Sequence, residues 1–160
     1  MAAPTPTARG TIPSPRKRLK DGFKLLVTFA RYPTIALWEI SGKPPGMDGG
    51  GGIDINTMQD DAFRPKYPRA KITETDATLK CAYDPATEDD IENMINIPDT
   101  ITYRWFDGST KAFFGFLDKW EPDELVEGTM PTGVATIIAS SWDHANEITA
   151  GPVVTSVAGS

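Results

Sequence analysis

Apolar side chains recur at every second position along much of this chain, and this spacing predicts a mainly β structure. From Phe23 to Phe29 the odd-numbered residues are all apolar, and later segments show a similar alternation. Strands are expected at residues 23–29, 34–40, 70–83, 100–120 (as a hairpin) and 131–140. Ser41-Gly42 is expected to end the second of these strands, and Asp84-Pro85 the third. Residues 153–157 are expected to pair at a sheet edge or to fray.

One segment changes from strand spacing to helical spacing. In residues 87–95, Ile91, Met94 and Ile95 form an apolar stripe, and acidic residues fill the first turn. Thr87 is the expected N-cap, with Asp90 at the third helical position. A helix this short and amphipathic should lie against a sheet.

The hairpin at residues 100–120 is the clearest local prediction, because Asp107-Gly108 suits a two-residue turn. That turn places Arg104 opposite Lys111, a like-charge pair that costs stability. Either a bulge changes the register, or an acidic partner from another subunit covers this face. The same turn gives a core face made of Ile101, Tyr103, Trp105, Thr110, Ala112, Phe114 and Phe116.

Residues 42–69 form a long segment without regular alternation, except at residues 53–58. The segment begins at Gly42 and has five further glycines, at positions 46 and 49–52, and prolines at 44, 45, 65 and 68. Connections of this length inside a compact domain are usually functional or disordered. No Lys-Ser/Thr pair or helix follows the glycines, so the sequence does not favour a phosphate-binding loop.

Composition narrows the possible functions. The formal net charge of −6 and the pI near 4.7 argue against tight nucleic-acid binding, which depends on Lys and Arg. Cys81 is the single cysteine, which excludes an internal disulfide and indicates a buried, reduced thiol. We expect neither a secretory signal nor a membrane span. Residues 1–20 hold four prolines and a basic cluster, and either a disordered tail or an arm that docks on a neighbouring subunit fits them.

Candidate catalytic and metal-binding groups are sparse. His144 is the only histidine, and a lone histidine makes neither a multi-histidine metal site nor a convincing Ser/His/Asp set. We expect no catalytic residues, no metal, no cofactor and no enzyme activity. Two sets of acidic residues are not expected to form sites. Asp48, Asp54, Asp60 and Asp61 lack the alternating spacing and the terminal Glu of a calcium-binding EF-hand loop. Asp89, Asp90 and Glu92 are the residues that a helix N-terminus prefers, so they do not indicate an acid/base pair. Four tryptophans leave open a sugar-stacking platform: Trp38, Trp105, Trp120 and Trp142.

The order of four segments gives a family resemblance. They are ALWEISGKPPGMDGGGGIDINTM, CAYDPATEDDIENMIN, ITYRWFDGSTKAFFGFLDKWEP and GTMPTGVATIIAS. From about Gly22 to Asp143 the chain resembles the tail tube (major tail) proteins of long-tailed, non-contractile bacteriophages. The resemblance implies an antiparallel β-sandwich, the tail-tube fold, with one short flanking helix and a long stacking loop. We expect three divisions: an extended N-terminal arm (1–21), the β-sandwich domain (22–146) and a C-terminal extension (147–160).

The resemblance also implies a function in the virion, assembled in the cytoplasm of a host bacterium. Six copies would form a ring, and rings would stack into a tube that surrounds a tape measure protein. Tail terminator and distal tail proteins would bind the tube ends. Genome DNA would pass through without specific binding, and we expect acidic residues to line the bore because they repel phosphates. No membrane partner is implied.

Carried onto this chain, the stacking loop is residues 42–69, where glycines let the backbone pack closely against the next ring. Its candidate contact residues are Met47, Asp48, Ile53, Phe63, Arg64 and Tyr67. Candidates for inter-subunit charge contacts are Arg16, Lys17, Arg18, Arg104 and Lys111. Two alternatives remain open: a tube protein of a contractile tail or secretion needle, and a carbohydrate-binding β-sandwich module.

Overall fold

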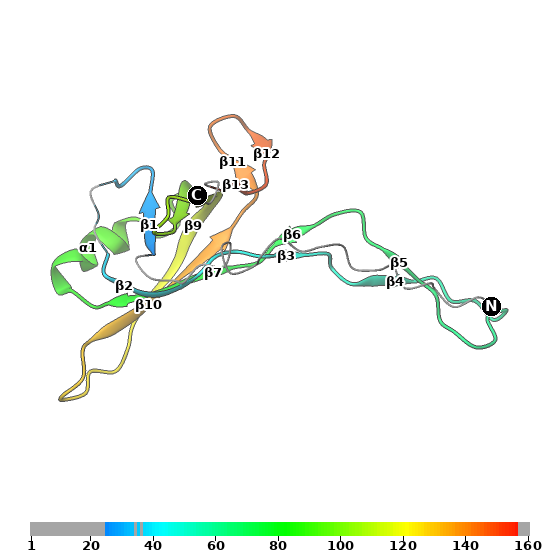
Figure 1. Cartoon of the computed structure of the whole chain (residues 1–160), viewed down its shortest axis with the longest axis horizontal. Helices are drawn as coiled ribbons and strands as arrows, with labels where there is room; N and C mark the ends of the chain where they lie inside the picture. The colour runs from blue at the N-terminus through cyan, green and yellow to red at the C-terminus, as the bar shows by residue number, and fades with distance from the viewer. Residues whose placement is uncertain (1–24, 34, 36, 157–160) are drawn as a thin grey trace.

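The computed structural model describes residues 25–33, 35 and 37–156 of the chain. The expected N-terminal arm (1–21), with Arg16, Lys17 and Arg18, lies outside the described residues, as does Phe23. Figure 1 shows a β-sheet body from which a long two-stranded arm extends. The described elements are β1 (Leu26–Phe29), β2 (Glu39–Lys43), β3 (Met47–Asp48), β4 (Gly52–Asp54), β5 (Lys66–Pro68), β6 (Thr73–Glu74), β7 (Ala77–Ala82), α1 (Pro85–Asn93), β8 (Asp99–Arg104), β9 (Thr110–Pro122), β10 (Thr132–Ala139), β11 (Trp142–Asp143), β12 (Ile148–Thr149) and β13 (Val153–Thr155).

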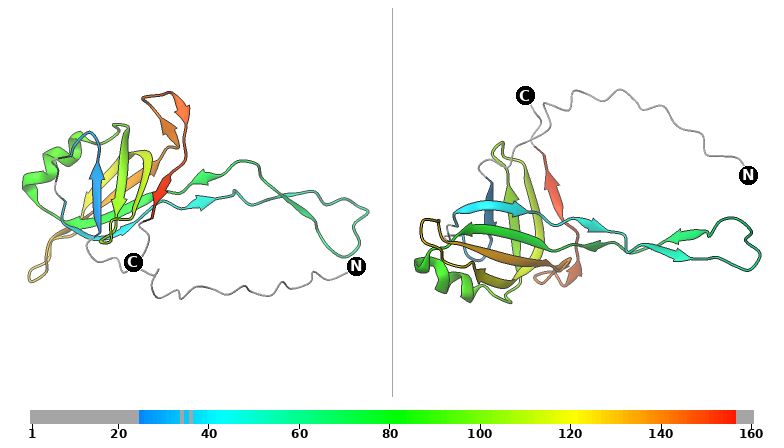
Figure 2. Two further views of the ribbon diagram at one scale, coloured as in Figure 1. Left: turned by 45° about the horizontal axis from the view of Figure 1, so that its top comes forward. Right: turned by 90° about the horizontal axis from the view of Figure 1, so that it is seen from below.

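The body is built on one seven-stranded antiparallel sheet that curls on itself (Figure 2). Its strand order is β1-β8-β9-β10-β7-β2, and β13 pairs with the start of β9. The two end strands approach each other, because Glu39 Oε1 accepts a 3.1 Å hydrogen bond from the Val27 amide. The mainly β fold with one short helix is therefore confirmed, and its core lies between two halves of one curled sheet.

Alternate side chains of these strands fill the core. Tyr103 and Phe113 meet there edge to face, with ring centroids 5.9 Å apart. Cys81 is fully buried and free, as expected, and burial raises the pKa of its thiol to about 11. The core cluster consists of Val27, Phe29, Ala77, Leu79, Ile91, Met94, Ile101, Tyr103, Phe113, Leu117, Ala135 and Ile137.

The helix and its N-cap lie three residues earlier than expected. Asp84, not Thr87, is the N-cap: its side chain accepts a hydrogen bond from the Ala86 amide, and Pro85 occupies the first turn. A proline at the first helical position loses no intrahelical bond, so the Asp-Pro pair that stops the preceding strand also starts the helix. Ile91 and Met94 are buried as the apolar stripe predicts. Among the described residues no helix has the length and apolar character needed to cross a bilayer.

The β8–β9 hairpin has a different register from the expected one. Trp105 N–H donates to the Ser109 carbonyl, and Gly108 N–H donates back to the Trp105 carbonyl. These bonds close a three-residue loop, in which Gly108 has a left-handed φ of 91°. The extra loop residue sets Arg104 opposite Thr110 and Lys111 opposite Tyr103.

This shift corrects two expectations. The like-charge pair of Arg104 and Lys111 does not form, so a changed register, the first of the two explanations, removes it. The core face of β9 carries Phe113 and Leu117, whereas Ala112, Phe114 and Phe116 are only half-buried on the other face. Trp105 lies half-buried beside the turn and outside the core cluster.

The second expected strand is also placed differently. β2 covers Glu39–Lys43, so Ser41-Gly42 lies inside this strand and does not close it. Gly42 lies where a Cβ would come within 2.7 Å of Leu25 Cδ2, which explains a glycine within a strand. At the other end of the chain, β13 pairs with β9, which confirms the expected edge pairing.

Gly115 provides a test of the β9–β10 contact. A Cβ at this position would lie 2.3 Å from the Ile138 carbonyl oxygen. We predict that Gly115→Ala lowers the free energy of unfolding by about 2 kcal/mol, because the two strands must separate to admit the methyl group. Chemical denaturation followed by tryptophan fluorescence measures the change.

Gly49→Ala is the matched control, because a Cβ at that position meets nothing within 4 Å. Its expected effect is within about 0.5 kcal/mol of the parent chain. Equal stability losses for the two variants would contradict this account of the strand packing.

Candidate assembly surfaces

The predicted stacking loop is a two-stranded arm, which we define as residues 44–76. Two short antiparallel ladders hold its halves together, β3 with β6 and β4 with β5, and the pairing of β2 with β7 in the body leads into its base. The expected irregular segment is therefore largely a paired ribbon (Figures 1 and 2). The sequence did not predict this pairing, because each of these two ladders is only two or three residue pairs long. Such short strands give no recognisable alternation of apolar and polar residues.

Large apolar side chains are exposed along the whole arm. Ile53 and Tyr67 are direct cross-strand partners, and 45% and 63% of their surfaces are exposed. Phe63 is 68% exposed near the far end. The arm has seven such side chains: Met47, Ile53, Ile55, Met58, Phe63, Tyr67 and Ile72. Apolar side chains gathered on one projecting element mark a surface that another molecule covers.

The predicted contact residues thus lie on the arm and are all exposed: Met47, Asp48, Ile53, Phe63, Arg64 and Tyr67. The structure brings Ile53 and Tyr67 together, while Met47 and Asp48 lie in β3, nearer the body. Asp48 has a local structural contact, because its Oδ1 accepts a 2.8 Å hydrogen bond from the Gly50 amide. Their contacts in an assembly stay a prediction.

Charge is divided between the two halves of the arm. In the outgoing half, residues 46–61 have four acids and no cation. In the returning half, residues 62–72 have four cations and no acid, and two acids, Glu74 and Asp76, follow at its base. Backbone amides bind three of the four acids locally, since Asp48, Asp54 and Asp60 accept from Gly50, Asn56 and Thr57. The side chains of the four cations make no hydrogen bond or ion pair with the described residues. These cations are Arg64, Lys66, Arg69 and Lys71.

A cluster of contacts fixes the arm where it leaves the body. Thr75 N–H donates to the Gly46 carbonyl at 2.9 Å, and Gly46 N–H donates to the Thr75 hydroxyl at 2.8 Å. Lys111 Nζ, from β9, donates to the carbonyl of Pro45, a fully buried residue. We call these four residues the arm root. Because the arm has no core of its own, its direction depends on these bonds.

Glu74 lies beside the arm root in an unusual environment. Only 7% of its surface is exposed, and neither carboxylate oxygen receives a hydrogen bond of good geometry. Burial raises the pKa of Glu74, and the nearby Ser141 hydroxyl and Lys111 ammonium partly oppose that rise. Glu74 is one wall of a groove of about 670 Å³, lined further by Met47, Lys71, Ile72, Ser140, Ser141, Trp142, Thr149, Ala150 and Gly151.

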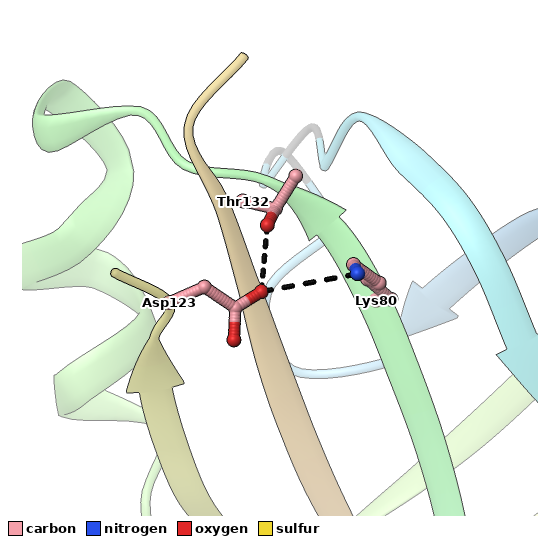
Figure 3. A network of polar contacts seen from close by, with 3 residues as sticks. All are labelled: Lys80, Asp123 and Thr132. Carbon is pink, nitrogen blue, oxygen red and sulfur yellow. Dashed lines mark hydrogen bonds and ion pairs between the residues drawn. The ribbon is translucent and has the colours of Figure 1, made fainter. Parts of the chain in front are cut away.

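A second projection was not predicted from the sequence. It is the β9–β10 connection, residues 121–131, which we call the acidic hairpin because it has four acids and no cation. Figure 3 shows its base: Thr132 Oγ1 donates to Asp123 Oδ2 at 2.6 Å, and Lys80 Nζ lies 4.0 Å from the same oxygen. Asp123 N–H also donates to the Thr132 carbonyl at 2.8 Å.

The tip of the acidic hairpin is ordered by a turn. The Thr129 amide and hydroxyl both donate to the Val126 carbonyl, and Gly128 has a left-handed φ of 82°. This turn presents Leu125, Val126 and Met130, which are 68%, 54% and 61% exposed. The sequence did hold a signal for this turn, because Gly128 follows the apolar pair Leu125-Val126. The sequence around it shows no strand alternation, so it did not predict that these apolar side chains are exposed.

The expected inter-subunit charges divide into two groups. Arg16, Lys17 and Arg18 lie outside the described residues. Arg104 is exposed at the end of β8, whereas Lys111 is half-buried and holds the arm root within its own subunit. Sequence reasoning missed this internal role, because the Pro45 partner is 66 residues away.

The residues considered for other functions are not brought together. The four tryptophans lie on separate elements, and Trp120 stacks on Tyr83, with ring centroids 6.5 Å apart. His144 is exposed and lines a cavity of about 130 Å³ beside Asp143 and Asp99. In the part of the chain that the structure describes, no three His, Cys, Asp or Glu side chains are grouped to hold a metal ion.

Comparison with known proteins gives matches at the level of structure only. No protein-family model and no curated protein matches the chain. A chain in the cryo-EM structure of an extracellular contractile injection system, the PVC sheath-tube complex in its extended state, is similar with a TM-score of 0.59 and 14% identity. The similarity covers 92% of this chain and 100% of that one.

A second similar chain belongs to the cryo-EM structure of the anti-feeding prophage (AFP) baseplate, 6-fold symmetrised. Its TM-score is 0.52 at 9% identity, over 72% of this chain and 87% of that one. The fold described above is therefore shared with chains of contractile injection systems.

Lys111→Met tests the arm root. Removing the ammonium leaves the buried Pro45 carbonyl without its donor, so we predict a loss of about 1–3 kcal/mol in the free energy of unfolding. The Thr75 amide, which depends on the same geometry, should exchange its hydrogen faster. Denaturation and hydrogen exchange with mass spectrometry measure the two effects.

Lys80→Met is the matched control, because the Lys80–Asp123 pair is solvent-exposed and 4.0 Å long. Such a pair contributes less than about 1 kcal/mol. The arm root would not depend on Lys111 if Thr75 exchanged equally slowly in both variants.

Glu74→Gln tests the buried carboxyl. A raised pKa means that the folded chain binds this proton more tightly than the unfolded chain, so folded-state stability falls as pH rises above about 4. The Gln variant of the dissociated subunit should therefore be more stable than the parent at pH 7, by on the order of 1 kcal/mol. The difference should shrink as pH falls from 7 toward about 4, because the carboxyl is then protonated in both the folded and the unfolded chain. Denaturation at several pH values measures it, and a pH-independent loss would contradict it.

Proposed function

We propose that this chain is a tail tube protein, whose copies form hexameric rings that stack into a hollow tube through their arms. The observation that carries the proposal is the arm itself. It is a paired ribbon, fixed at its root, that exposes seven large apolar side chains to solvent. Such a ribbon gains little by standing free, and burying those side chains against neighbouring subunits stabilises an assembly.

The body supports the same proposal. Its fold is similar over nearly the whole chain to a chain of a sheath-tube complex. β1 and β2 are the end strands of the curled sheet, and unpaired strand edges favour pairing with another copy. A closed ring of subunits removes such edges, so ring formation and edge protection are one event.

In this proposal the tube is a conduit. Genome DNA passes through it without specific binding, and the tube surrounds a tape measure protein, with tail terminator and distal tail proteins at its ends. The net charge of −6 fits a conduit, because an acidic wall repels phosphates.

A tube inside a contractile sheath is the second candidate. The specific observation in its favour is that both similar structures come from contractile injection systems. The first candidate is the tube of a non-contractile tail, which has no sheath. Electron microscopy of the native particle therefore distinguishes the two candidates, because a contractile particle has a sheath layer around the tube.

Phe63→Ser tests the function of the arm. We predict that this variant forms far fewer tubes at a given concentration, because Phe63 is 68% exposed in the free subunit and would be buried on stacking. Negative-stain electron microscopy over a concentration series counts the tubes. Phe106→Ser is the control, an aromatic of similar exposure, 55%, that lies outside the arm.

A shortened arm gives a stronger form of this test. Asp48 and Thr73 are cross-strand partners, so Asn-Gly in place of residues 49–72 joins them by a two-residue turn. The body should keep its circular dichroism spectrum and lose tube formation. Tubes from the shortened chain, or equal effects of the two Phe variants, would contradict the arm-stacking proposal.

A further inference from the structure

We propose that the acidic hairpin of one copy receives the returning half of the arm of a second copy. This inference rests on the proposed stacking of copies and identifies the surface that the arm contacts. The occupant is a second copy of this chain.

Charge complementarity is the first argument. Residues 62–72 hold four cations without an acid, and residues 121–131 hold four acids without a cation. The arm cations have no partner among the described residues, and neither do Glu124 and Glu127 at the tip of the acidic hairpin. Asp123 and Glu121 are different. Thr132 and Lys80 hold Asp123 at the hairpin base (Figure 3), and Glu121 Oε1 lies 2.6 Å from Lys119 Nζ. The structure thus leaves opposite charges available on the two projections.

Apolar surface is the second argument. The returning half of the arm exposes Phe63 and Tyr67, at 68% and 63%. The acidic hairpin exposes Leu125 and Met130, at 68% and 61%, between its acids. The returning half of the arm and the acidic hairpin therefore each present apolar side chains between charges of one sign, an arrangement suited to an interface with a dry core and a charged rim.

Position is the third argument. The arm and the acidic hairpin extend from opposite sides of the body in all the views of Figures 1 and 2. A contact between two different surfaces is heterologous, so each copy can receive one neighbour and contact another, and the contact repeats from copy to copy. The ten residue steps from Arg64 to Glu74 span roughly 33 Å as an extended strand, so the arm reaches well beyond its own body.

The experiment reverses the charges of the arm and of the acidic hairpin, separately and together, in the full-length chain. Arg64→Glu with Arg69→Glu reverses the arm, and Glu124→Arg with Glu127→Arg reverses the acidic hairpin. Each double variant should lower the yield of tubes at least about tenfold, because like charges then meet. The chain carrying all four substitutions has the parent composition and net charge, and it should recover most of the yield.

Asp89→Arg with Asp90→Arg is the matched control for the hairpin reversal, since it makes the same change in net charge as that variant but at exposed positions of α1. It should form tubes as the parent does. Full assembly by the hairpin-reversed chain, or failure of the four-fold variant to improve on the double variants, would overturn the inference. In the first case tubes still form, so the proposed function stands; absence of tubes from the parent chain would instead reject that function.

A cross-link gives a second readout that does not depend on yield. Ala62→Cys, at an exposed position beside Phe63, and Val126→Cys in one chain should form disulfides between copies when assembled protein is treated with diamide, which is reduced as the thiols are oxidised. Cys81 is buried with a raised thiol pKa of about 11, so it stays unreactive. Ala62→Cys with Asp89→Cys is the control pair. A ladder of linked chains from the first pair alone is expected, and equal linking by both pairs would contradict the contact.

Discussion

The direction of the arm depends on a few hydrogen bonds at its root. A two-stranded ribbon has no core of its own and is only marginally stable unless it is attached to something larger. Here Lys111 in the central strand β9 binds the Pro45 carbonyl, and Gly46 and Thr75 bind each other across the two halves. The seven-stranded sheet therefore serves as the rigid support that the arm lacks.

The same constraint explains why polar groups lie where a core would otherwise continue. Lys111 occupies a strand position between apolar residues, and its ammonium is held by a carbonyl and lies near Glu74. Glu74 has no good hydrogen-bond donor of its own, so its burial costs stability in the free subunit. A body that accepts this cost to orient a projecting ribbon fits a protein whose function is to contact other copies.

Sequence alone predicted much of the body and little of the geometry that directs the arm. Period-two patterns located most of the main strands, and the apolar stripe located the helix, because these signals repeat over several residues. The β8–β9 register was wrong by one residue, since Asp-Gly fits both a two-residue turn and the three-residue loop that forms. The arm root was beyond prediction, because it joins residues 29 and 66 positions apart. The exposed apolar residues of the arm were predicted, but their pairing was not.

Cryo-electron microscopy of particles assembled from the purified full-length chain tests the central claim most directly. We predict a hollow tube of stacked six-subunit rings, in which residues 44–76 of each subunit leave their own ring and lie against the next one. Tubes in which the arm stays within its own ring, or particles without stacked rings, would contradict the account.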